Sequence, residues 1–149
     1  MAIELFDPEL VIARIDAQVA AFKHIGGSAD LNAAIQGGPL TPPAAFVIPL
    51  AERPRQNEYA SEIVSQRDDV SCGVIYAVRN LRDALGREAH VELRALRISV
   101  MTALLGWTPD SDVYDVFTYA PSGGRLLQFA DQVLWWQDDF ATALYLRSI

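Results

Sequence analysis

The chain has 149 residues, a length that fits one domain with one hydrophobic core. Its 12 basic and 19 acidic side chains give a formal net charge of −7, which argues against a protein that holds DNA through phosphate contacts. The apolar runs are too short to span a membrane, and the acidic start does not resemble an export signal, so we expect residence in the cytosol where the chain is made. Cys72 is the only cysteine, which excludes an intrachain disulfide and a cysteine-rich zinc site, and we expect it to pack as a small apolar side chain.

The first part of the chain predicts two helices. A capping residue, Asp7, followed by a proline predicts a helix from residue 7 to about residue 22, which carries an apolar stripe that should face a sheet. A short helix is expected between two glycine pairs, over residues 28–36, where Ser28 or Asp30 could cap its start.

The middle of the chain predicts strands separated by polar segments. The apolar run 44–50 is expected to be a strand whose end is set by Pro49. The polar stretch 52–57 is expected to be an exposed loop. Residues 63–66 and 70–78 have strand character, so the charged residues 67–69 between them predict a hairpin turn. The second of these strands should be central in the sheet.

A long helix is predicted over residues 87–105, after a polar connection at 80–86, and Gly106 should end it. One apolar stripe of this helix should pack on the sheet. A second stripe widens the apolar surface in the last turns, and it could be a subunit interface or could be covered by the first helix or the C-terminal segment. Its members are Val91, Ala95, Ile98, Met101 and Leu105.

The last third changes to a period of two residues, which is typical of strands. We expect a strand at 113–119, a glycine-rich turn at 120–124, a strand at 125–128 and a closing run at 133–146 that favours a strand, with a helical ending left open. The order of elements predicts an α+β fold. Its mostly antiparallel or mixed sheet should carry the two main helices on one face, in a single domain spanning 1–149.

Residues that could perform catalysis or bind a cofactor or metal are scarce. No phosphate-binding glycine loop is present, the two histidines lack a metal-ligand spacing, and no cofactor is predicted. Two acidic pairs occur. Asp68 and Asp69 are expected to lie in a solvated turn, whereas Asp138 and Asp139 lie among aromatic residues, so at least one should meet an arginine or a backbone donor.

Trp107, Trp135 and Trp136 are the heaviest apolar side chains and are expected mainly in the core. Trp135 and Trp136 are consecutive, so on a strand they point to opposite faces. One of them should therefore face away from the core, towards solvent or a partner, and we take Trp136 as the candidate. Truncation of Trp107 to alanine is expected to cost about 3–5 kcal/mol of stability.

The C-terminal half resembles the phage tail terminator family, also known as minor tail or tail completion proteins. A Leu-Gly-Trp-Thr-Pro turn at 105–109 and a Trp-Trp-Gln-Asp-Asp-Phe run at 135–140 carry the resemblance, and the strands at 43–49 and 73–79 are similar too. The family's packing signature is expected at Gly106, Trp107, Pro109, Trp135 and Phe140.

The resemblance implies a structural protein of the virion. It implies a homo-oligomeric ring, usually six-fold, at the head-proximal end of the tail, which ends tube polymerisation and offers a surface for head joining. Its partners would be further copies of the chain, the tail tube protein and the head-tail connector or neck protein, with a sheath protein left open, and genomic DNA would pass the channel without specific binding. Alternatives are a connector or neck protein and, more remotely, a small hydrolase that uses Asp138 and Asp139.

The loop 53–69 is predicted to be mobile in the free subunit and ordered in the ring. Several charged residues and one tryptophan are predicted to form the interface. The candidates are Arg53, Arg55, Glu58, Asp68, Asp69 and Trp136.

Overall fold

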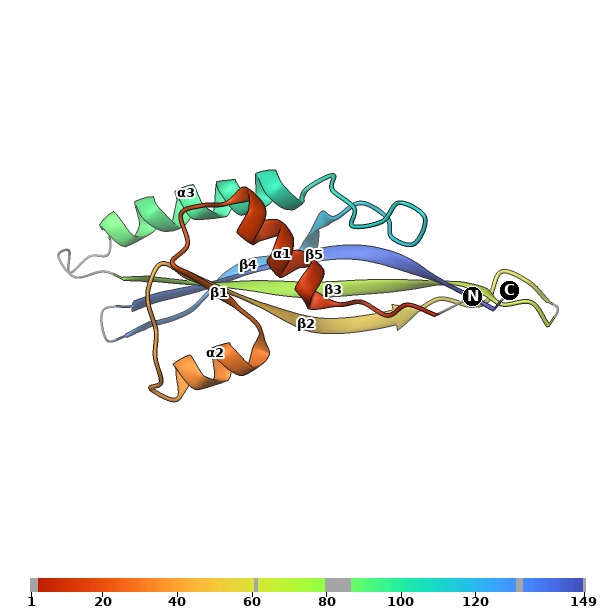
Figure 1. The fold of residues 1–149 in the computed structure, drawn as a ribbon, viewed down its shortest axis with the longest axis horizontal. Helices are drawn as coiled ribbons and strands as arrows, with labels where there is room; N and C mark the ends of the chain where they lie inside the picture. The colour runs from red at the N-terminus through yellow and green to blue at the C-terminus, as the bar shows by residue number, and fades with distance from the viewer. Residues whose placement is uncertain (1–2, 61, 80–86, 131–132, 149) are drawn as a thin grey trace.

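The computed structural model describes residues 3–60, 62–79, 87–130 and 133–148, and shows one five-stranded sheet with three helices (Figure 1). The elements are α1 (Pro8–Gln18), β1 (His24–Gly26), α2 (Ser28–Ile35), β2 (Ala44–Pro54), β3 (Ser65–Arg79), α3 (Arg87–Leu104), β4 (Thr118–Ala130) and β5 (Val133–Arg147). The strand order is β1-β2-β3-β5-β4, with β1 parallel to β2 and every other pair antiparallel. The predicted α+β class with a mixed, mostly antiparallel sheet is confirmed.

The main core lies between the sheet and the two helices α1 and α3, which pack on the same face as predicted (Figure 1). Side chains alternate along the central strand β3, so Cys72, Val74 and Tyr76 point into this core. Ile75 and Ala77 point to the other face, where they pack with α2 in a smaller cluster. α2 lies at one end of that face and covers only part of it (Figure 1).

The N-terminal helix is shorter than the pattern predicts. The Glu9 amide donates to Asp7 Oδ1 at 3.0 Å, which confirms the cap, but α1 ends at Gln18 instead of near residue 22. The chain then turns into β1, whose backbone pairs with β2. At α2, Asp30 Oδ2 accepts a hydrogen bond from the Gly27 amide at 3.0 Å, so one of the two proposed caps is confirmed.

The predicted hairpin turn at 67–69 is wrong. β3 runs unbroken through these residues, and β2 continues past Pro49 to Pro54 by way of a register shift between Pro49 and Ala51. The predicted end of this strand at Pro49 is therefore wrong, and so is the first half of the predicted loop 52–57, because residues 52–54 pair with β3. Arg53 pairs with Asp69 across the two strands. The strand persists because β2 and β5 satisfy its backbone on both sides. The connection between β2 and β3 lies earlier in the chain, between Pro54 and Ser65.

The C-terminal strands also differ in their limits. Residues 113–117 are not a strand; they run along the edge of β5, where the Asp115 amide donates to the Ala143 carbonyl at 2.9 Å. The expected turn at 120–124 is instead a bulge within β4, since Tyr119 pairs with Phe140 and the next paired residue is Gly124, opposite Asp138. The closing run is a strand to its end. The predicted connection at 80–86 lies outside the described residues.

The second apolar stripe of α3 is exposed except at Met101, which is partly buried and packs against the main core. Val91 is 72% exposed, Ile98 48% and Leu105 44%, so the alternative in which α1 or the C-terminal segment covers the stripe is wrong for these three side chains. The end of the helix is as predicted, because Gly106 adopts a φ of 80°, a left-handed conformation that glycine tolerates.

Candidate functional site

The part of the sheet that α2 leaves uncovered forms an open concavity of about 1060 Å³. Its floor consists of small side chains from three neighbouring strands, such as Ala51, Ser71 and Ala141. We call this surface the open sheet face. Its defining residues are Ala51, Arg53, Arg55, Arg67, Asp69, Ser71, Asp115, Val116 and Ala141.

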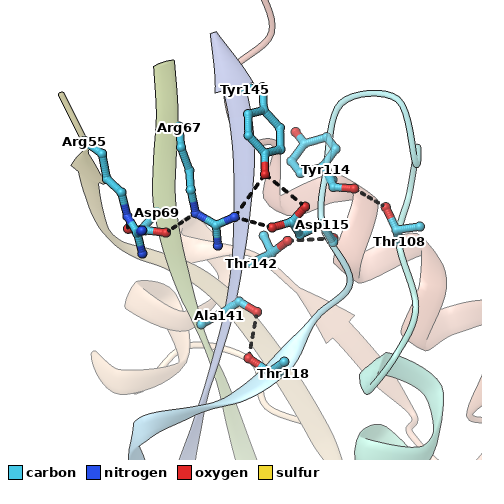
Figure 2. Close-up of polar contacts among 10 residues, drawn as sticks. All are labelled: Arg55, Arg67, Asp69, Thr108, Tyr114, Asp115, Thr118, Ala141, Thr142 and Tyr145. Atoms are coloured by element: carbon cyan, nitrogen blue, oxygen red, sulfur yellow. Dashed lines mark hydrogen bonds and ion pairs between the residues drawn. The ribbon is translucent and has the colours of Figure 1, made fainter. Parts of the chain in front are cut away.

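A network of ion pairs borders the floor (Figure 2). Arg67 and Asp69 are two residues apart on β3 and so share a face, and Arg67 Nε lies 2.9 Å from Asp69 Oδ1. Arg67 Nη1 pairs with Asp115 and donates to Tyr145 Oη at 3.0 Å, while Arg55 Nε lies 2.7 Å from Asp69 Oδ2. The hydrogen bond from Arg55, followed by that from Arg67, lowers the pKa of Asp69 against the opposing effect of burial. The Asp69 carboxylate is thus held ionised between two arginines.

The wall of the concavity beside β5 is tied to the sheet by backbone and hydroxyl contacts (Figure 2). Thr142 Oγ1 donates to the Asp115 carbonyl at 2.8 Å, and Thr108 Oγ1 donates to the Tyr114 carbonyl at 3.0 Å. Tyr114 itself is buried on the other side of the sheet. These contacts hold the segment before β4 against the strand edge, so the surface is built on ordered elements.

Three of the six predicted interface residues gather here. Arg53, Arg55 and Asp69 all line the open sheet face. Glu58 lies in the exposed connection between β2 and β3, where its amide donates to the Ser65 carbonyl at 3.1 Å. The sequence predicted that these residues lie in one loop, but in the structure Arg53 and Asp69 lie on the paired strands β2 and β3.

Asp68 does not lie in a solvated turn, because its side chain points to the face of α1 and α3 and the residue is only 2% exposed. Its Oδ1 has no hydrogen-bond partner among the described residues. Burial, followed by the charge of Asp69, raises the pKa of Asp68. This carboxyl group is therefore buried on the face of the sheet that carries α1 and α3, and it is not part of the open sheet face.

Trp135 and Trp136 point to opposite faces, as predicted, but each is partly buried. Trp135 stacks on Phe46 with ring centroids 6.2 Å apart, on the face that carries α2. Trp136 packs against the main core, and the Arg97 guanidinium lies 4.7 Å from the centre of its ring. The prediction that one of them faces away from the core is wrong, because helices cover both faces of the sheet at this point. A role for Trp136 in an interface stays a prediction.

Asp138 and Asp139 each meet an arginine, which confirms that expectation. Arg97 donates to both oxygens of Asp138, at 2.9 and 3.0 Å, and Arg125 Nη1 lies 3.0 Å from Asp139 Oδ2. Burial is the largest influence on the pKa of Asp139 and raises it, but hydrogen bonds, first from Gln137, bring the net shift below the usual value. The two carboxylates lie on opposite faces of β5 and cannot act on one substrate atom.

Arg97 is not among the residues predicted from the sequence. Its only signal is an arginine one position after Leu96, at the edge of the buried stripe of α3.

The predicted signature residues lie around the end of α3 and on β5. The Gly106 amide donates to the Phe117 carbonyl at 2.9 Å, and the Trp107 ring stacks on Phe117 with centroids 5.6 Å apart. Pro109 is half-buried and Phe140 is fully buried. Within the described ranges no group of three His, Cys, Asp or Glu side chains could hold a metal ion. Each described helix is too short or too polar to cross a membrane.

The sheet carries an open face with a charged rim, a surface suited to contacts with another protein chain. Comparison with known families makes this specific: a family model described as phage tail terminator protein matches residues 1–149, the whole chain. The chain belongs to the phage tail terminator family, and its role is structural, in the phage tail. A search of the curated proteins found no match.

Proposed function

We propose that the chain assembles as a ring at the head-proximal end of the tail tube. The family resemblance implies that such a ring usually has six copies. There it ends the addition of tube subunits and presents a surface for the head. The observation that carries this proposal is the family match, which covers all of residues 1–149.

The surface of the subunit supports a role in assembly. The open sheet face and the exposed apolar side chains of α3 offer areas that contacts with other chains could cover. The proposed partners are further copies of the chain, the tail tube protein and the connector or neck protein of the head. With a net charge of −7, the ring would let genomic DNA pass without holding it.

A connector or neck protein is the second candidate, because it too joins chains by surface contacts. A hydrolase that uses Asp138 and Asp139 has less support, since each carboxylate is fixed by its own arginine and the two point to opposite faces. Neither is arranged as a general acid or base.

The test is the length distribution of tails, measured by negative-stain electron microscopy in lysates from a strain that lacks the gene and from one in which it is restored. Tails of runaway length without heads, corrected by restoring the gene, are the expected result. Uniform tails of normal length left unjoined to heads would favour the connector instead. Unaltered particles would contradict both roles.

A further inference from the structure

An apolar stripe runs along the outer side of α3, and no described residue covers it. Its members recur every three or four residues, and the large ones are exposed by 44–72%. The one hydroxyl within the stripe is satisfied in the helix itself, because Thr102 Oγ1 donates to the Ile98 carbonyl at 2.7 Å. We call this surface the α3 stripe. It comprises Val91, Ala95, Ile98, Thr102 and Leu105.

The open sheet face has the complementary shape. Its floor of alanine and serine leaves room for a helix to approach the strands, in the way that α2 packs on the neighbouring part of the same face.

Charges around the two surfaces are complementary. Glu88 and Glu92 border the α3 stripe, Arg53 lies on the open sheet face, and none of the three forms an ion pair with another described residue. Arg94 also borders the α3 stripe, and the carboxylate of Asp115 on the open sheet face is 39% exposed. Each surface therefore offers both signs of charge to the other.

We propose that the α3 stripe of one copy packs on the open sheet face of the next copy. This inference rests on the proposed function, because it supplies the contact by which the ring forms. The two surfaces lie on opposite sides of the sheet, so each copy uses both and the contact is heterologous. Such a contact repeats from copy to copy, and it closes into a ring when the rotation between neighbours allows it.

Cysteine crosslinking tests this contact directly. Ile98→Cys places a thiol on the α3 stripe, and Ala51→Cys places one on the open sheet face. The native Cys72 is fully buried and burial raises its pKa to about 12, so it does not react with a maleimide. The double variant is treated with a short bis-maleimide, both as concentrated pure protein and on tails purified from a strain that makes it.

The expected result is a ladder of crosslinked species from the double variant. An equal mixture of the two single variants should give dimers only, and each single variant alone should stay uncrosslinked. The matched control joins Ala51→Cys to Leu126→Cys, because Leu126 on β4 is 52% exposed, similar to Ile98, but lies outside the α3 stripe. This control should give no ladder.

Each other outcome has a definite meaning. Crosslinked dimers from Ile98→Cys alone would show a two-fold contact between stripes and overturn the inference. Capped tails of normal length without crosslinks from the double variant would overturn it too, while the proposed function stands. Tail length in the strain that lacks the gene tests the proposed function separately. A ladder from the double variant, together with unaltered particles in that strain, would support the contact and contradict tail termination. No ladder in either preparation, together with unaltered particles in that strain, would overturn both.

Discussion

Arg97 is expected to be the polar side chain whose loss destabilises the fold most. It donates two hydrogen bonds to Asp138, which is fully buried, and it covers the ring of Trp136. In Arg97→Met the apolar stem is kept, but the buried carboxylate loses its charged donor and keeps, among the described residues, the neutral donors Tyr119 Oη and Trp136 Nε1. Breaking a buried ion pair from one side costs about 3–5 kcal/mol. Because neutral donors remain, we expect a loss of about 3 kcal/mol.

Denaturant unfolding followed by circular dichroism measures this loss. For a domain of this size it corresponds to a fall of about 6–12 °C in melting temperature. Arg94→Met, on the exposed side of the same helix, is the control and should change stability by less than about 0.5 kcal/mol. A loss below about 1 kcal/mol in Arg97→Met would refute the assignment of a critical buried pair.

Four further predictions concern single positions or short segments. Burial, and then the charge of Asp69, raises the pKa of Asp68, so ionisation of Asp68 weakens folding as pH rises. Asp68→Asn should therefore unfold at an equal or higher denaturant concentration at pH 7, and this gain should be lost below the ordinary aspartate pKa. A lower unfolding midpoint of the variant at pH 7 would contradict this. Trp107→Ala should cost about 3 kcal/mol, the low end for a core aromatic, because the ring is only partly buried; an unchanged unfolding midpoint would show that the ring does not stabilise the core. Cys72 should resist maleimide in the native protein and react once it is unfolded; rapid labelling of the native state would disprove its burial. Amide exchange in the connection 55–64, of which residue 61 lies outside the described residues, should be fast in the free subunit and slow in the ring, and equal rates in both states would contradict ordering on assembly.

Features that depend on neighbours in sequence could be predicted from the sequence. The cap at Asp7, the end of α3 at Gly106 and the strand character of the closing run follow from local backbone and side-chain preferences. The pairing of Asp138 and Asp139 with arginines was predictable in kind, since buried carboxylates require partners. Which arginines serve them was not.

Strand limits in the middle of the chain were decided by tertiary structure. Residues 67–69 have the composition of a turn, but β2 and β5 pair with them on both sides, and Arg55, just past the end of β2, holds the Asp69 carboxylate. Local propensity is worth only a fraction of what such pairing contributes. The sequence alone therefore predicted a turn where the strand continues.

The sequence by itself determined the fold class, the family and the helix boundaries set by caps and glycines. Only the tertiary structure decided that α2 covers one end of its face and leaves the open sheet face bare, and that the α3 stripe remains exposed. The physical reason is that hydrophobic periodicity shows which side chains share a face, whereas covering that face depends on contacts between segments far apart in the chain.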